Sequence, residues 1–319
     1  MIRIENLSKS FGVKKAVDDV SFSVERGEVL GFLGPNGAGK STTMRMITGF
    51  LPPSGGRVWI GNYDVSVSPL QARRLMGYLP ENAASYPDMS VQGFLRFVAE
   101  MRGLRGDANR RAVNRVVELC FLESVLHQQI DTLSKGYRHR TCLAQALIHD
   151  PEVLIMDEPT DGLDPNQKYE VRSLIREMGR TKAVIFSTHI LEEVDAACSR
   201  AIIIDRGRIV ANGTPAELRN MSAIAGAVTI AAKGADAGKL AALPGAERVE
   251  PIDAQALRVY PQDKAASAAL ARAVVELAGR EGWSIEALRT EEGQLDEVFR
   301  RITLPDTSTA ADRRLQTQA

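Results

Sequence analysis

The sequence predicts an α/β fold, in which a parallel β-sheet with crossover helices is followed by a smaller α+β domain. Short runs that are apolar throughout alternate with segments of helical periodicity, as at Glu28–Leu33, Val153–Met156 and Ala183–Ser187. Such runs are typical of strands buried on both faces of a parallel sheet. Beyond residue 220 the composition becomes rich in alanine, and a length of 319 residues favours about two domains.

The composition excludes several classes of protein. A hydrophobic fraction of 44% and a charged fraction of 25% are those of a globular chain. Forty basic and forty acidic residues give a net charge of +0, so we expect no nucleic-acid partner. The three cysteines lie far apart, which argues against a disulfide framework and a zinc site. No apolar run approaches the roughly 20 residues of a spanning helix, and the charged N-terminus lacks the apolar core of a signal peptide.

The N-terminal third reads as strands that lead into a glycine-rich loop. Ile2–Leu7 and Val20–Val24 are predicted to be short strands with a turn-like segment between them. The buried strand at Glu28–Leu33 enters the loop, a helix is expected over Ser41–Phe50, and a further strand over 76–80.

The middle of the chain is predicted to be mainly helical, from residue 88 to residue 149. Val91–Met101 and Arg111–Leu126 carry apolar residues at spacings of three and four. After the two apolar strands, Ala201–Ile204 and Arg208–Val210 flank a hairpin turn.

Three segments are expected: a domain over 1–220, a small α+β domain over 221–303, and a disordered tail over 304–319. The tail is polar and lacks periodicity. The first six elements of the small domain have the order of a split βαβ sandwich. Its expected elements are strand Ala227–Ala231, helix Ala235–Leu243, strand Glu247–Ile252, strand Gln255–Tyr260, helix Asp263–Gly279, strand Ser284–Arg289 and helix Gln294–Thr303.

The glycine-rich loop matches the pattern G-x(4)-G-K-[ST] at every fixed position. Its backbone N–H groups can wrap around phosphates where a Cβ atom would block the approach. Lys40 supplies a positive charge to the β- and γ-phosphates, and the hydroxyl of Ser41 can ligate Mg²⁺. The following helix directs its N-terminal dipole at the anion. The predicted nucleotide-binding residues of this loop are Gly34, Pro35, Asn36, Gly37, Ala38, Gly39, Lys40, Ser41 and Thr42.

Two carboxylates follow the apolar strand at Val153–Met156. We expect Asp157 to reach Mg²⁺, directly or through water, and Glu158 to polarise the water that attacks the phosphate. An acidic pair after a strand is weak evidence alone, but behind a phosphate-binding loop it indicates a P-loop NTPase.

Further motifs resemble those of the ABC ATPases. The segment 133–140, LSKGYRHR, is similar to the family signature, LSGGQ followed by a basic residue, and it precedes the acidic strand as in the family. The segment 161–164, DGLD, resembles the D-loop. His189 falls where the family has its switch histidine, and Phe11 where an aromatic ring stacks on adenine. Residues 77–81, GYLPE, resemble the segment that carries the Q-loop.

The resemblance covers residues 2–218 and implies an ATP-hydrolysing subunit. Two copies would close head to tail around two Mg-ATP, with the signature of one copy on the γ-phosphate held by the other. The implied catalytic residues are Lys40, Glu158 and His189. The implied signature residues are Ser134, Lys135, Gly136 and Tyr137, with Asp164 in the D-loop; the implied Mg²⁺ ligands are Ser41, Glu81 and Asp157.

The same resemblance implies a separate membrane partner. The family supplies ATPase subunits to integral-membrane permeases, so we expect a peripheral location on the cytoplasmic face of the inner or plasma membrane. Lys135, Tyr137 and Glu81 depart from the usual Gly, Gln and Gln. These variants resemble exporters with short permeases, of the sodium, drug, copper-maturation and gliding-motility type. Residues 222–302 resemble a C-terminal extension of that branch.

Some alternatives stay open on the sequence alone. A soluble ABC ATPase that acts on ribosomes or DNA is disfavoured by the single phosphate loop and by the lack of zinc cysteines or a long coiled coil. A nucleotide sensor without hydrolysis is disfavoured by Glu158 and His189. Phe11 is either an adenine stack or a core residue, and the apolar residues of 82–101 form either a permease surface or a helical core. The residues concerned in the second case are Pro87, Met89, Phe94 and Phe97.

Overall fold

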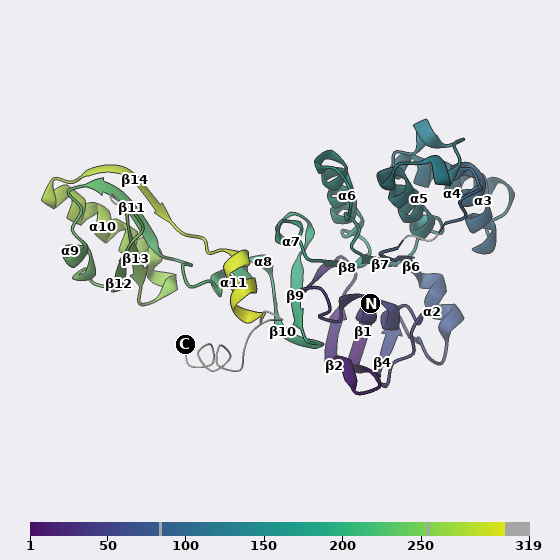
Figure 1. Ribbon diagram of the computed structural model, residues 1–319, viewed down its shortest axis with the longest axis horizontal. Helices are drawn as coiled ribbons and strands as arrows, with labels where there is room; N and C mark the ends of the chain where they lie inside the picture. Colours follow the sequence, from purple (N-terminus) through teal and green to yellow (C-terminus); the bar gives the residue numbers. More distant parts are fainter. Residues whose placement is uncertain (83–84, 254–255, 304–319) are drawn as a thin grey trace. The chain divides into compact units, whose positions relative to one another are not determined.

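The computed structural model describes residues 1–82, 85–253 and 256–303, and the expected tail lies outside them. The chain divides into two compact units, Met1–Thr214 and Pro215–Ala319. The division falls a few residues before the expected boundary at 220, because helix α8 (Pro215–Asn220) packs on helix α11 (Leu295–Ile302) (Figure 1). None of the described helices is both long enough and apolar enough to span a bilayer.

The first unit is built on a six-stranded sheet of order β10-β9-β3-β8-β7-β6. Strands β9 to β6 are parallel, and β10 pairs antiparallel with β9. β3, β7 and β8 are buried along their whole length, as their apolar sequences predict. The strands are Val29–Leu33 (β3), Met76–Leu79 (β6), Val153–Asp157 (β7), Ala183–Thr188 (β8), Arg200–Asp205 (β9) and Arg208–Gly213 (β10).

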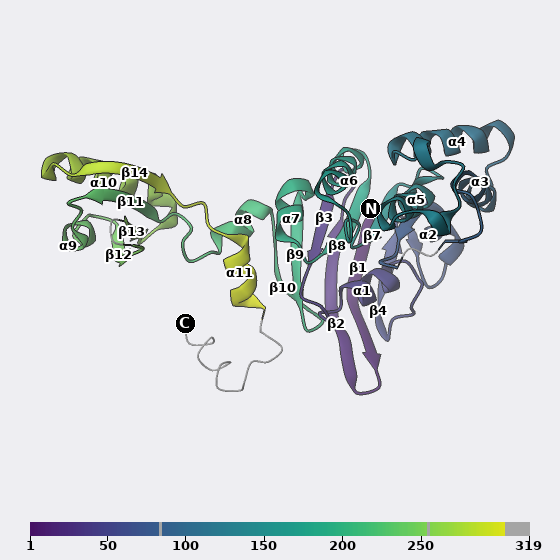
Figure 2. The ribbon, with the colours of Figure 1, turned by 45° about the horizontal axis from the view of Figure 1, so that its top comes forward.

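A second, antiparallel sheet of order β2-β1-β4-β5 faces the first (Figure 2). Its first two strands are longer than expected and meet at a tight turn beginning at Gly12, so the turn-like segment predicted between them is strand for most of its length. The additional residues are largely polar and exposed, and they lack the apolar alternation of a half-buried strand. The strands are Ile2–Phe11 (β1), Lys14–Val24 (β2), Gly55–Ile60 (β4) and Tyr63–Asp64 (β5).

The helices of the first unit fill the crossovers of the central sheet. The predicted helix Val91–Met101 is confirmed, but the next helix starts at Gly106 and ends at Leu119, not at Leu126. Phe121 has a φ of 55°, which no α-helix accommodates, and a short 3₁₀ turn follows. The helices are Lys40–Ile47 (α1), Pro69–Leu75 (α2), Val91–Met101 (α3), Gly106–Leu119 (α4), Lys135–Leu147 (α5), Pro165–Met178 (α6) and Leu191–Ala197 (α7).

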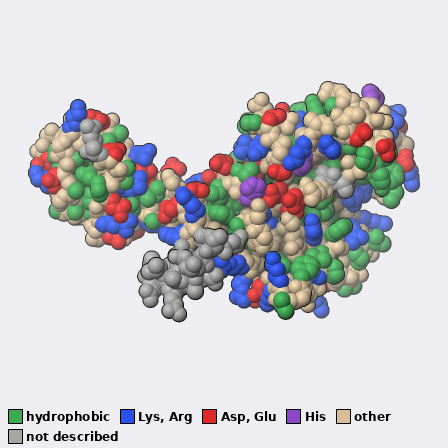
Figure 3. Space-filling view, in the orientation of Figure 1, with side chains coloured by type: hydrophobic (Ala, Val, Ile, Leu, Met, Phe, Trp, Pro, Cys, Tyr) green, Lys and Arg blue, Asp and Glu red, His purple; other side chains and the backbone are tan. Residues whose placement is uncertain are grey.

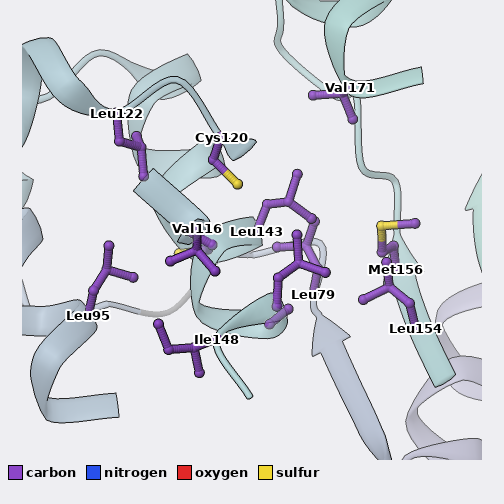
Figure 4. Close-up of a cluster of buried hydrophobic side chains, with 14 of the residues drawn as sticks. Leu79, Leu95, Val116, Cys120, Leu122, Leu143, Ile148, Leu154, Met156 and Val171 are labelled. Carbon is purple, nitrogen blue, oxygen red and sulfur yellow. The ribbon is translucent and has the colours of Figure 1, made fainter. Parts of the chain in front are cut away.

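Two apolar clusters cover the two faces of the central sheet. One lies between the sheets and includes Met44 and Ile47 of α1, which fixes the helix that follows the glycine-rich loop. The other joins β6 and β7 to the helices α3 to α6, and Figure 4 shows its side chains converging from the helices onto the strands. Because α1 and α5 are both anchored in these cores, their N-termini have fixed positions beside the sheet.

The second unit contains an antiparallel sheet of order β12-β13-β11-β14, against which α9 and α10 pack. All seven elements expected here are present, and the first six give the split βαβ topology. Val228, Ile230, Leu270 and Val274 are buried between sheet and helices. The elements are Val228–Lys233 (β11), Ala237–Ala241 (α9), Ala246–Pro251 (β12), Ala256–Pro261 (β13), Ser267–Glu281 (α10), Ser284–Thr290 (β14) and Leu295–Ile302 (α11).

Two histidines, the buried His139 and the half-buried His149, make the stability of the first unit depend on pH. Burial lowers the pKa of His139 and of His149 to about 4, although Asp161 acts in the opposite direction on His139. Below pH 6.5 the unfolded chain therefore binds more protons than the folded chain. The stability that depends on keeping the two rings neutral is fully present above pH 6.5 and is lost as the pH falls toward 4. We expect the free energy of unfolding to fall by about 1 kcal/mol for each of the two histidines when the pH is lowered from 7.5 to 5.5.

Urea unfolding at the two pH values measures this dependence. In the double variant His139→Gln/His149→Gln, the free energy of unfolding should differ much less between pH 7.5 and pH 5.5 than it does in the wild type. An unchanged dependence in that variant would show that other groups are responsible.

Candidate functional site

The glycine-rich loop connects β3 to α1 at the carboxyl edge of the central sheet. A Cβ atom at Gly34 would lie 2.5 Å from the carbonyl oxygen of Ile204, and one at Gly39 would lie 2.6 Å from that of Ala16. Gly39 also has a φ of 109°, which L-residues rarely adopt. The loop therefore requires glycine at these positions, and its backbone stays accessible for a close approach by an anion.

Lys40 is the first residue of α1, and its side chain turns back over the loop. Its Nζ donates to the carbonyl oxygens of Gly34, at 2.8 Å, and Pro35, at 3.3 Å, and lies 3.7 Å from Oε1 of Glu158. Burial holds the pKa of Lys40 below its ordinary value, and the carboxylates of Glu158 and Asp157 partly oppose that shift. The ammonium group thus sits between the loop and the acidic pair.

The acidic pair is positioned by the neighbouring strand. Ser187 on β8 donates from its hydroxyl to Oδ1 of Asp157 and accepts from the backbone N–H of Glu158 at 3.0 Å. Glu158 has a φ of 51°, an uncommon conformation for a residue with a Cβ atom. Its Oε2 lies 3.0 Å from Nδ1 of His189, which directly follows β8. One carboxylate therefore contacts both Lys40 and His189.

These contacts bring together the three residues predicted to be catalytic. Parallel strands present their carboxyl ends at one edge of the sheet, so the loop after β3, the acids after β7 and the histidine after β8 converge there. Ser187 and Glu193 were missed as positioning residues, because each has a partner about 30 residues away in the sequence, Asp157 for Ser187 and Thr160 for Glu193. Glu193 is buried and accepts from the hydroxyls of Thr160 and Thr188, which flank the acids and the histidine.

A cavity of about 410 Å³ opens over the loop. Phe11 is half exposed at its edge, which favours the stacking role over the core role left open by the sequence. Glu81 and Glu158 border it on the acidic side. Lys14 and Ala16 of β2 also line it, and no motif marks them. The lining residues are Phe11, Lys14, Ala16, Asn36, Gly37, Gly39, Lys40, Ser41, Thr42, Glu81 and Glu158.

The residues around the cavity fit a hard divalent cation. Oδ2 of Asp157 is buried and has no hydrogen-bond partner, so this oxygen is left to a cation or a water molecule. Ser41 and Glu81 add a hydroxyl and a carboxylate at the cavity wall. An all-oxygen donor set of this kind suits Mg²⁺, which normally keeps several waters and phosphate oxygens as its remaining ligands.

The signature residues lie outside this cavity. Ser134 is the N-cap of α5, and its hydroxyl accepts from the N–H of Tyr137 at 3.3 Å. A Cβ atom at Gly136 would lie 2.5 Å from Oε1 of Gln167, so the helix approaches α6 closely. Asp164 is the N-cap of α6 and accepts from the N–H of Gln167 at 2.9 Å. Ser134 and Asp164 therefore cap the starts of two neighbouring helices outside the cavity.

The four apolar residues considered within 82–101 divide between the helical core and the surface. Phe94 is buried in the helical core and Met89 packs against it. Pro87 and Phe97 are exposed, and Phe97 meets Tyr86 edge-on at 5.6 Å between ring centroids.

On the face shown in Figure 3, basic and acidic side chains are interspersed over both units.

Replacing Glu193 with alanine should destabilise the first unit, because two buried hydroxyls would lose their acceptor. We expect a loss of about 2–4 kcal/mol in the free energy of unfolding. Urea denaturation measures it. Glu192→Ala, one residue away and exposed, is the matched control and should change the stability by less than about 0.5 kcal/mol. Equal losses in the two variants would contradict the role given to Glu193.

Replacing Phe11 with alanine should weaken nucleotide binding without unfolding the chain, because its ring is half exposed. Loss of one aromatic stack corresponds to about a five- to tenfold rise in the Kd for ATP. Titration with a fluorescent ATP analogue measures this. Phe50→Ala, another exposed ring, should leave the Kd unchanged. Equal affinities in wild type and Phe11→Ala would place the adenine elsewhere.

Comparison with known proteins agrees with this geometry. A family model described as "ABC transporter" matches residues 17–161. The linearmycin resistance ATP-binding protein LnrL of Bacillus subtilis (strain 168) is 39% identical over 220 residues, which cover 68% of this chain and 70% of the relative. The Nod factor export ATP-binding protein I of Ralstonia nicotianae is 33% identical over 304 residues, 95% of this chain and 94% of the relative.

Solved structures agree as well. The chain is similar, at 30% identity and a TM-score of 0.64, to an ATP-binding subunit of an ABC transporter, covering 69% of this chain and 92% of that one. A dimeric bacterial ABC transporter cassette, MJ0796, shares the fold at 22% identity and a TM-score of 0.63, covering 67% of this chain and 99% of that one. The α/β fold and the family resemblance are thereby confirmed. The chain belongs to the ABC transporter family, as an ATP-binding subunit with ATPase activity.

Proposed function

We propose that two copies of this chain close head to tail around two Mg-ATP and drive a separate membrane permease, as an exporter. The observation that carries this proposal is the division of the chemistry within one copy. The phosphate loop and Glu158 line one cavity, and His189 contacts Glu158, whereas the signature residues begin a helix outside that cavity. A second copy supplies the missing side of the cavity, and the dimeric cassette of the same fold supports this arrangement.

In this arrangement Glu158 is the general base. Its carboxylate accepts the proton of the water that attacks the γ-phosphate, and His189, 3.0 Å away, orients that carboxylate. Lys40 holds the β- and γ-phosphates, and Ser41, Asp157 and Glu81 would hold Mg²⁺, which would neutralise phosphate charge. The ring of Phe11 stacks on the adenine. The N-terminus of α5 in the partner copy, with Ser134 and Gly136, contacts the γ-phosphate from the opposite side.

The permease is a separate chain in this proposal. The exposed rings of Tyr86 and Phe97 on the segment after Glu81 are its contact surface, because this segment links the cavity to α3. ATP-driven closure and opening would thus be transmitted to the permease. The complex would place this chain on the cytoplasmic face of the membrane. The export direction is supported by the relatives named for linearmycin resistance and Nod factor export.

A tagged pull-down from membranes in mild detergent tests the proposed partner. We expect a stoichiometric polytopic membrane protein, and the double variant Tyr86→Ala/Phe97→Ala should reduce its recovery by about tenfold. Tyr169→Ala, an exposed ring on α6, is the matched control and should leave recovery unchanged. Recovery of ribosomes or nucleic acid with no polytopic partner would overturn the transporter assignment and favour a soluble ABC ATPase.

A further inference from the structure

Lys135 occupies an unfavourable position for a basic residue. It is the first residue of α5, where the helix dipole disfavours positive charge, and the first turn contains no acidic residue to compensate. A residue that breaks a local rule in this way is expected at a functional site. The carboxylate that compensates the charge of Lys135 comes from outside the helix.

The Lys135 side chain crosses to the loop that follows β7. Its Nζ lies 2.8 Å from Oδ2 of Asp161. Between them the chain passes over Gly162, where a Cβ atom would lie within 2.6 Å of Cδ, Cε and Nζ of Lys135. Gly162 also has a φ of 69°. The glycine therefore leaves the path that the lysine needs, and the lysine fastens the D-loop to the start of the signature helix.

The pair controls the charge beside that helix start. The hydrogen bond from Lys135 is the main reason that the pKa of Asp161 lies below its ordinary value, so the carboxyl stays ionised. Both side chains are more than half exposed, at 66% and 52%, so an incoming ligand can approach them. Without Lys135, the Asp161 carboxylate, which lies within reach of a side chain at the start of α5, would be unpaired and would repel a phosphate that approaches there.

We propose that Lys135 is a positioning residue for the phosphate contact made in trans: it neutralises Asp161 and holds the D-loop against the N-terminus of α5. The γ-phosphate carried by the second copy then meets an anion-binding helix start without an adjacent unpaired carboxylate. This inference rests on the proposed head-to-tail pairing.

The test measures ATP-driven pairing in protein that cannot hydrolyse ATP. In the Glu158→Gln background, light scattering gives the Mg-ATP concentration at which half of the protein is dimeric. Lys135→Met should raise that concentration about threefold per site and about tenfold for the two-site dimer. Adding Asp161→Asn to Lys135→Met should restore it to within about twofold, because the unpaired charge is gone. Arg110→Met, which breaks the exposed Arg110–Asp107 pair on α4, is the matched control and should change nothing.

The possible results separate the role of Lys135 from the head-to-tail pairing itself. If Lys135→Met pairs as readily as its parent, or if Asp161→Asn does not rescue it, the charge role is wrong and only the Lys135 proposal falls. If the Glu158→Gln parent itself does not pair at saturating Mg-ATP, the head-to-tail sandwich fails and this proposal falls with it.

Discussion

Glu158→Gln should lower the rate of ATP hydrolysis by about 10²- to 10⁴-fold while ATP binding is retained. The amide keeps the size of the side chain but cannot accept the proton of the attacking water. Lys40, the phosphate loop and Phe11 are untouched, so the Kd for ATP should change by less than about threefold. Steady-state phosphate release and nucleotide titration measure the two quantities.

The control is a carboxylate at the other end of the same strand. Glu152 precedes β7, is partly exposed and pairs with Arg26. Glu152→Gln should keep hydrolysis within about twofold of wild type. Retention of more than a tenth of the activity by Glu158→Gln would assign the general base to another group.

Lys40→Ala should weaken nucleotide binding and abolish turnover. Removing a charge-assisted contact to phosphate costs about 1.5–3 kcal/mol, which is about a 10- to 100-fold rise in the Kd for ATP. Hydrolysis should fall further, because Lys40 also stabilises the charge that develops in the transition state. Burial already disfavours the charged form of this side chain, so the substitution also removes a desolvation cost.

Lys14 provides the matched comparison for this experiment. It lines the same cavity, but it lies on β2 and outside the phosphate loop. Lys14→Ala should raise the Kd by no more than about fivefold. Equal effects of the two substitutions would mean that Lys40 acts only through the general charge of the cavity.

The sequence predicted the buried strands and the loop between β3 and α1, because their signals are local. VLIM is apolar throughout and AVIFS is apolar up to its final serine, and the glycine pattern is set by close contacts such as Gly34 with Ile204. The polar half of the first hairpin gave no such signal, so its strands were predicted too short. The end of α4 was also missed, because the left-handed conformation of Phe121 depends on tertiary packing rather than on helix propensity.

The residues of the candidate site also differ in whether a local sequence pattern reveals them. Motif residues such as Lys40, Glu158 and His189 were found in the sequence, and the structure brings them into contact. Ser187 binds the backbone of Glu158, 29 residues away, and Glu193 accepts from Thr160, 33 residues away, and from Thr188 beside the histidine. A single serine or glutamate has no sequence pattern of its own. The Lys135–Asp161 pair was equally invisible, although each residue lies in a motif that the sequence revealed.

The most direct test of the proposed mechanism is the mass of the Glu158→Gln protein in solution with and without Mg-ATP. The head-to-tail arrangement predicts a shift from 34.7 kDa to twice that mass on addition of Mg-ATP. Adding Ser134→Arg, which places a bulky side chain at the start of α5, should abolish the shift. A Glu158→Gln protein that keeps the mass of one chain at saturating Mg-ATP, or a dimer that Ser134→Arg leaves intact, would contradict the sandwich.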